Sequence, residues 1–114
     1  MNIKKFASVP TLIEIKLDNE ELVSKYGEPI TFYTYDVVGM STYFEFFNAR
    51  SNSEFAALDK MMKALILDDK GNKVLAENED LPVDIAAAAI AKIGDILGKS
   101  QGKPLIPTVG TQQE

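Results

Sequence analysis

The sequence predicts a small α+β domain that is dominated by helices and contains a few short strands. Three observations support this prediction. Apolar and polar residues alternate over residues 11–17, which is typical of a half-buried strand. Apolar residues recur at helical spacing over residues 55–65 and 82–97. A chain of 114 residues with 46% apolar side chains has room for one domain with one core.

The composition divides the chain into three segments. Residues 1–10 show no periodicity and end at a proline, so we interpret them as an N-terminal arm. Residues 11–98 contain all the periodic patterns and form the expected globular domain. Residues 99–114 are rich in Gly, Pro, Gln and Thr without any period, which predicts a disordered tail.

The first strand leads into a short helix. Asp18 is the expected N-cap of this helix, because Glu21 three residues later completes the spacing of a capping box. Gly27 is expected to adopt the left-handed conformation that ends many helices, and Pro29 prevents continuation. The buried face of the strand is expected to consist of Ile13, Ile15 and Leu17.

A second strand and a second helix follow. Residues 30–38 are rich in β-branched and aromatic side chains, which favours a strand that Gly39 interrupts. We expect Ser41 or Thr42 to open a helix that runs to about Arg50.

Ser51 marks the expected start of a third helix, since Glu54 again has the spacing of a capping box. Asp59 and Lys63 are an acid–base pair four residues apart, expected on its polar side. The apolar stripe of this helix is predicted to consist of Phe55, Leu58, Met62 and Leu65.

The last part of the domain is predicted to be a turn followed by a long helix. Residues 65–75 indicate two short extended pieces around a turn in which Gly71 takes a positive φ. Asp80 and Pro82 mark the start of the helix, and Gly98 is expected to end it after Leu97. Its buried face is predicted to contain Ile85, Ala89, Ile93 and Leu97.

The composition excludes several kinds of chemistry. The chain has no Cys and no His, which removes zinc sites built on them, thiol nucleophiles, disulfides and histidine-based triads. No P-loop and no dinucleotide-binding glycine pattern occurs, so we expect neither a cofactor nor a metal. We therefore expect a protein that is not an enzyme. A small carboxylate-dependent enzyme is the alternative, because acidic pairs such as Asp68 and Asp69 are present.

The charge pattern bears on partners and compartment. The formal net charge is −5 and the lysines are scattered among acids, so no nucleic-acid partner is expected. The longest apolar run, Ile85–Ile93, is interrupted by Lys92 and falls short of the roughly 20 residues of a membrane span. The N-terminus lacks the apolar stretch of a signal peptide. We expect a soluble cytoplasmic protein that does not bind membranes.

Aromatic residues crowd into one part of the chain, where nine of the ten fall between Tyr26 and Phe55. Successive helical residues are about 100° apart, so adjacent aromatics cannot share one narrow stripe. They form either a thick core or a surface that contacts a partner. The adjacent methionines of the third helix leave the same two alternatives open. The candidate partner-binding residues are Tyr43, Phe44, Phe46, Phe47, Met61 and Met62.

The order of several segments resembles a known family. These segments are EIKLD at 14–18, KYGEPITF at 25–32, LDDKGNKVL at 67–75, and DLP at 80–82 before a helix. In layout, over about residues 11–98, the chain resembles the tail assembly chaperones of long, non-contractile-tailed, lambda-like bacteriophages.

The resemblance implies a non-enzymatic function. Such a chaperone binds the tape-measure protein, keeps it soluble and leaves as the tail tube polymerises, which also implies self-association into oligomers. The family implies a longer form, made by a ribosomal frameshift, that contacts the tail-tube protein. Gly98-Lys99 and Gly102-Lys103 are the candidate frameshift positions. The alternative is a small structural virion protein, such as a tail-completion or head–tail joining subunit.

Overall fold

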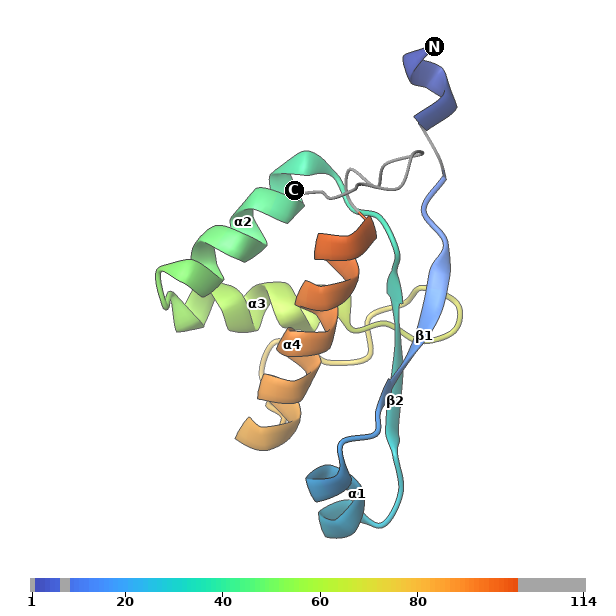
Figure 1. The fold of residues 1–114 in the computed structure, drawn as a ribbon. Coiled ribbons are helices and arrows are strands. Elements are labelled where there is room, and N and C mark those ends of the chain that lie inside the picture. Colours follow the sequence, from blue (N-terminus) through green and yellow to red (C-terminus); the bar gives the residue numbers. More distant parts are fainter. Residues whose placement is uncertain (1, 7–8, 101–114) are drawn as a thin grey trace, which may run out of the picture.

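The computed structural model describes residues 2–6 and 9–100 and has the α+β architecture that the sequence predicts (Figure 1). Helices account for most of its regular structure, as expected. In chain order the elements are η1 (Ile3–Phe6), β1 (Leu12–Leu17), α1 (Glu20–Tyr26), β2 (Ile30–Tyr35), α2 (Met40–Ser51), α3 (Phe55–Leu65) and α4 (Val83–Ser100).

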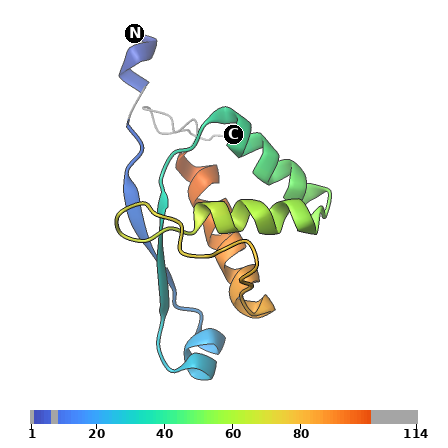
Figure 2. The same cartoon turned by 180° about the vertical axis from the view of Figure 1, so that it is seen from behind.

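Strands β1 and β2 form an antiparallel sheet in which Ile15 lies opposite Phe32. Leu67 adds an isolated antiparallel bridge to Tyr33 on the far side of β2. Helices α2, α3 and α4 lie on one side of the hairpin, with α1 at the end where β1 leads into β2 (Figures 1 and 2). The alternation of the strand sequences explains this arrangement, because Ile15 and Phe32 are buried on the same face of the sheet.

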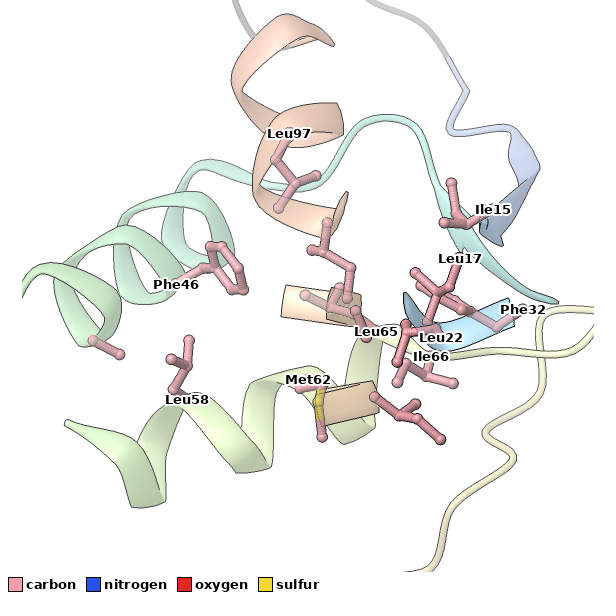
Figure 3. Packing of buried hydrophobic residues seen from close by; sticks show 14 residues of the cluster. Ile15, Leu17, Leu22, Phe32, Phe46, Leu58, Met62, Leu65, Ile66 and Leu97 are labelled. Atoms are coloured by element: carbon pink, nitrogen blue, oxygen red, sulfur yellow. The ribbon is translucent and has the colours of Figure 1, made fainter. Parts of the chain in front are cut away.

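The core lies between this sheet face and the three long helices (Figure 3). The predicted stripe of α4 is confirmed, since Ile85, Ala89, Ile93 and Leu97 are all buried. In α3 the stripe is confirmed for Leu58, Met62 and Leu65. The prediction for Phe55 is wrong, because this residue is 73% exposed at the first position of α3, beyond the packed part of the helix.

The predicted N-terminal residues of α1, α2 and α3 are all wrong. The N-cap of α1 is Asn19 rather than Asp18, and the N-cap of α2 is Gly39, so Ser41 and Thr42 lie inside the helix. The side chain of Asn19 makes no hydrogen bond to α1, and Gly39 has no side chain that could cap α2. In α1 the amide of Val23 bonds to the carbonyl of Asn19 at 2.9 Å. Backbone hydrogen bonds therefore set this helix start without a capping box.

The connection between α2 and α3 is tighter than the sequence predicts. Ser51 is the last residue of α2, and Glu54 is the N-cap of α3. The amide of Glu54 bonds to the carbonyl of Ala49 at 2.8 Å, and Ser53 takes a positive φ of 54°. With these backbone contacts, α2 extends past Arg50. Ser51 is therefore part of α2 and cannot be the N-cap of α3.

Two further boundaries differ from the prediction. Strand β2 ends at Tyr35 instead of Val38; the next residue, Asp36, accepts a hydrogen bond from the amide of Thr11 through Oδ1 at 2.9 Å. Helix α4 begins at Val83, after Asp80, and continues through Gly98 to Ser100. A glycine inside a helix costs only about 1 kcal/mol, so Gly98 does not by itself end α4.

The two predicted left-handed glycines are confirmed. Gly27 ends α1 with a φ of 90°, and Gly71 has a φ of 85° in the turn after α3. In that turn, Oδ1 of Asp68 accepts hydrogen bonds from the amides of Asn72 and Lys70, each at 2.9 Å. The hydrogen bond from Asn72, followed by that from Lys70, lowers the pKa of Asp68.

The predicted arm and tail are described only in part. The arm contains η1 and ends in the exposed residues Val9 and Pro10. Of the predicted tail, residues 101–114 lie outside the described residues, and so does the second candidate frameshift position. Within the described part of the chain, no helix combines the length and apolarity needed to cross a bilayer.

Candidate functional site

Helix α2 divides the aromatic candidates between the core and the surface. Phe46 is fully buried, Tyr43 and Phe47 pack against the core, and Phe44 is 55% exposed. The rings form one continuous cluster, in which the centroids of Tyr43 and Phe47 are 4.8 Å apart. The centroid distance is 5.2 Å for Phe46 and Phe47, and 5.4 Å for Tyr43 and Phe44. Helix α2 therefore contributes three of these rings to the core or its border and leaves Phe44 at the surface.

The adjacent methionines of α3 are divided in the same way. Met62 is buried in the core, whereas Met61 lines two hollows beside α2 and α3, one of which also reaches the arm and the end of β2. Met62 and Phe46 are therefore inaccessible to a partner in this structure. Phe44 and Met61, with the half-buried Tyr43 and Phe47, remain the candidates from the sequence that lie at or near the surface.

An apolar groove lies where the start of α3 meets the first half of α4. It has a volume of about 550 Å³ and is open to solvent. Phe55 and Leu58 contribute from α3, and Leu81 contributes from the connection before α4. The α4 side consists of Val83, Ala86, Ala87, Ile90 and Ala91. We call this feature the α3–α4 groove.

The sequence explains why the groove is open. The alanines of α4 have side chains too short to fill the space beside α3, so an apolar hollow remains. Phe55 and Val83 are 73% and 85% exposed, although both are apolar. Large apolar side chains that gather around a hollow at this exposure are typical of a protein-binding surface.

A buried lysine joins α3 to the connection that precedes α4. Lys63 of α3 is buried and donates to Oδ1 of Asp80 at 2.7 Å and to the carbonyl of Glu77 at 3.0 Å. It also forms a salt bridge of 3.2 Å with Asp59, which confirms the predicted acid–base pair. The predicted place of the pair on the polar side of α3 is wrong for Lys63, because this residue is buried. The hydrogen bond to Asp80 raises the pKa of Lys63, and the contacts with Asp59 act in the same direction against desolvation.

Asp59 and Asp80 both line the α3–α4 groove, so their contacts with Lys63 hold its charged edge in place. Arg50, at the end of α2, is the cationic residue of this edge. Its guanidinium lies against Gly94 of α4, where a Cβ atom would collide with it. The groove is thus apolar along its length and bordered by charges of both signs.

In the acidic pairs Asp68/Asp69 and Glu79/Asp80, three of the carboxylates form hydrogen bonds within the fold. Asp68 accepts hydrogen bonds from two amides of its own turn, Asp80 binds Lys63, and Oε1 of Glu79 accepts one from the amide of Ala76 at 2.7 Å. Among the described residues, no three acidic side chains are grouped closely enough to hold a metal ion.

The sequence pattern does not identify the α3–α4 groove. It predicts a core position for Phe55, and it does not single out Leu81, Val83 or Ile90. The available signal is the alanine run beginning at Ala86, since small side chains let another helix approach closely. No protein-family model, curated protein or solved structure matches this chain.

Proposed function

We propose that this protein is a phage tail assembly chaperone that binds apolar helical stripes of the tape-measure protein in the α3–α4 groove. The observation that carries the proposal is the exposure of Phe55 and Val83 beside an open apolar groove. The layout of residues 11–98, which resembles such chaperones, supports the choice of partner.

The shape and chemistry of the groove favour an amphipathic helix as its ligand. Helices that bind in grooves present apolar side chains at i, i+3, i+4 and i+7. The alanines of α4 allow such a helix to approach closely, while Phe55 and Val83 can cover its apolar stripe from both sides. Phe44 and Met40, one helical turn apart and both exposed on α2, offer a second apolar contact to a long ligand.

The other features of the proposal are consistent with this mode of binding. A net charge of −5 favours solubility of a complex that covers an apolar helix. The chaperone acts without catalysis or a cofactor, in the cytoplasm of the bacterial host. A longer, frameshifted form would bring the tail-tube protein to the same complex.

Co-expression with the tape-measure protein tests the proposal. We expect the wild-type chain to increase the soluble fraction of the tape-measure protein and to co-purify with it. Val83→Asp places a charge in the groove and should abolish both effects. Val9→Asp is the matched control, since Val9 is 86% exposed but lies outside the groove, and it should behave as the wild type. Failure of the wild-type chain to co-purify and to raise solubility would contradict the proposal.

Mass spectrometry of purified virions separates this function from that of a structural virion protein. A chaperone that leaves during tube polymerisation should be absent from the particles. A tail-completion or joining subunit would be present at a constant number per particle, and that result would contradict the chaperone proposal.

A further inference from the structure

We propose that the outer edge of β1 is a self-association surface, at which the β1 strands of two copies pair antiparallel. This pairing involves the chain alone and is independent of the proposed function. The direction of the backbone groups of β1 and the charges along its exposed face support it.

The hydrogen bonds identify which residues of β1 face outward. The amide of Asp36 bonds to the carbonyl of Thr11 at 3.0 Å, so the backbone of Thr11 points toward β2. Backbone direction alternates along a strand, and the other odd-numbered residues of β1 therefore point the same way. The even-numbered residues Leu12, Glu14 and Lys16 direct their N–H and C=O groups away from β2.

The far side of β2 gives independent evidence for this assignment. Tyr33 lies opposite Glu14 in the register. Its amide and carbonyl both bond to Leu67, at 2.9 Å and 2.8 Å, so its backbone points away from β1. In an antiparallel pair, opposite residues point either toward each other or both outward. Glu14 therefore points outward as well.

The outer edge of β1 has no strand partner among the residues that the structure describes. Both ribbon views show helices α2, α3 and α4 together on one side of the hairpin (Figures 1 and 2). An edge strand with free backbone groups is a template for pairing with another chain. Leu67 already bonds to the outer edge of β2 at Tyr33, whereas the structure shows no backbone hydrogen bond at the outer edge of β1 among the described residues.

The charges on β1 select a second copy and one register. The side chains of Glu14 and Lys16 are both exposed on the face opposite the core. Antiparallel pairing about a two-fold axis through Ile15 places Glu14 of each copy directly opposite Lys16 of the other. The resulting interface contains two opposite-charge pairs. Pairing about Glu14 instead would place the two Glu14 carboxylates against each other, which is unfavourable.

This register satisfies the outward backbone groups of β1 and leaves the hydrogen bonds within each copy unchanged. The outward backbone groups of Glu14 and Lys16 hydrogen-bond across the interface, and both copies place their helices on the same face of a four-stranded sheet. The ladder within each copy is unchanged, because the odd-numbered residues keep their bonds to β2. Pairing at this edge therefore breaks none of the hydrogen bonds between β1 and β2.

Charge reversal tests the interface with the full chain alone in sedimentation velocity. We expect the wild type to be dimeric at micromolar concentrations. Glu14→Lys and Lys16→Glu should each weaken the dimer by about tenfold or more, because each creates two like-charge pairs. An equimolar mixture of the two variants should recover the dimer, since every cross-strand pair is then opposite in charge. Lys60→Glu, at an exposed position on α3, should leave dimerisation unchanged.

A monomeric wild type, or single variants that dimerise as the wild type does, would overturn the proposal. Cysteine cross-linking tests the register, because the chain has no natural Cys. A mixture of Glu14→Cys and Lys16→Cys should form a disulfide, since directly opposite Cα atoms are about 5.5 Å apart in a hydrogen-bonded pair. Neither variant alone should cross-link. Equal cross-linking of each variant by itself would contradict the register.

Discussion

Thr34 is a polar residue in the middle of the core. It is fully buried on β2, and its hydroxyl has no hydrogen-bond partner in the described part of the chain. Burying a hydroxyl without a partner costs free energy that an apolar side chain of the same shape avoids.

We therefore expect Thr34→Val to raise the free energy of unfolding by about 1 kcal/mol, because valine has a similar shape and no hydroxyl. Urea denaturation followed by circular dichroism measures the change. Thr31→Val, at an exposed position of the same strand, is the control and should change stability by less than about 0.5 kcal/mol. A loss of stability in Thr34→Val would show that the hydroxyl has a favourable interaction.

Asp84 connects α4 to α1. Its carboxylate accepts a hydrogen bond from Nζ of Lys25 at 3.0 Å and another from the hydroxyl of Tyr26 at 3.1 Å. The contact with Lys25 is the main reason that the pKa of Asp84 is lowered, with a further contribution from Tyr26. The same contact raises the pKa of Lys25.

The direction of the pKa shift of Asp84 predicts a pH dependence. Because the folded state lowers this pKa, the stabilisation is present above the ordinary value of 3.8 and is lost as the pH falls through the folded value. The stability difference between the wild type and Asp84→Asn should stay constant from pH 7 to about pH 4 and shrink below that. Denaturation midpoints across this range measure it. Glu45→Gln, on α2, serves as the control, and a difference that grows on acidification would contradict the prediction.

At the scale of the elements, α4 has two faces with different roles. Ile93 is fully buried against the core, whereas Val83 is exposed in the α3–α4 groove. Ile93→Ala should lower the free energy of unfolding by about 3 kcal/mol, since it removes buried methyl groups and leaves a cavity. Val83→Ala should change stability by less than about 0.5 kcal/mol. Chemical denaturation of both variants measures the contrast, and similar losses would mean that the groove belongs to the core.

Sequence periodicity is sufficient to predict the buried face of an element whose residues repeat at a regular spacing. The alternation of β1 and the stripe of α4 both identify the buried face, because burial repeats at the period of each element. Helix starts are not predictable in the same way. Several Ser, Thr and Asp residues stand near each start, and backbone contacts such as that between Glu54 and Ala49 decide among them.

The candidate site is only partly predictable for a related reason. Phe46 and Phe47 are neighbours about 100° apart, so the rotation of α2 against α4 decides which of them is fully buried. The α3–α4 groove depends on the contact of Lys63 with Asp80, which are seventeen residues apart in the chain. A contact of this kind leaves no periodic signal in the sequence.

At the scale of the whole molecule, the two proposed surfaces are separate. The edge of β1 and the turn between α2 and α3 lie on opposite sides of the fold in both ribbon views (Figures 1 and 2). None of the residues that line the α3–α4 groove belongs to β1. A dimer with two grooves would bind a long, repetitive helical ligand more tightly than a monomer, because the second contact becomes intramolecular.

The affinity for a helical segment of the tape-measure protein tests the central claim most directly. Fluorescence anisotropy of the labelled segment, titrated with the wild type, Val83→Asp and Val9→Asp, gives three dissociation constants. We expect saturable binding to the wild type and to Val9→Asp, and at least about tenfold weaker binding to Val83→Asp, which corresponds to about 1.4 kcal/mol. Equal affinity of all three proteins, or no binding to the wild type, would contradict the assignment of the groove as the chaperone site.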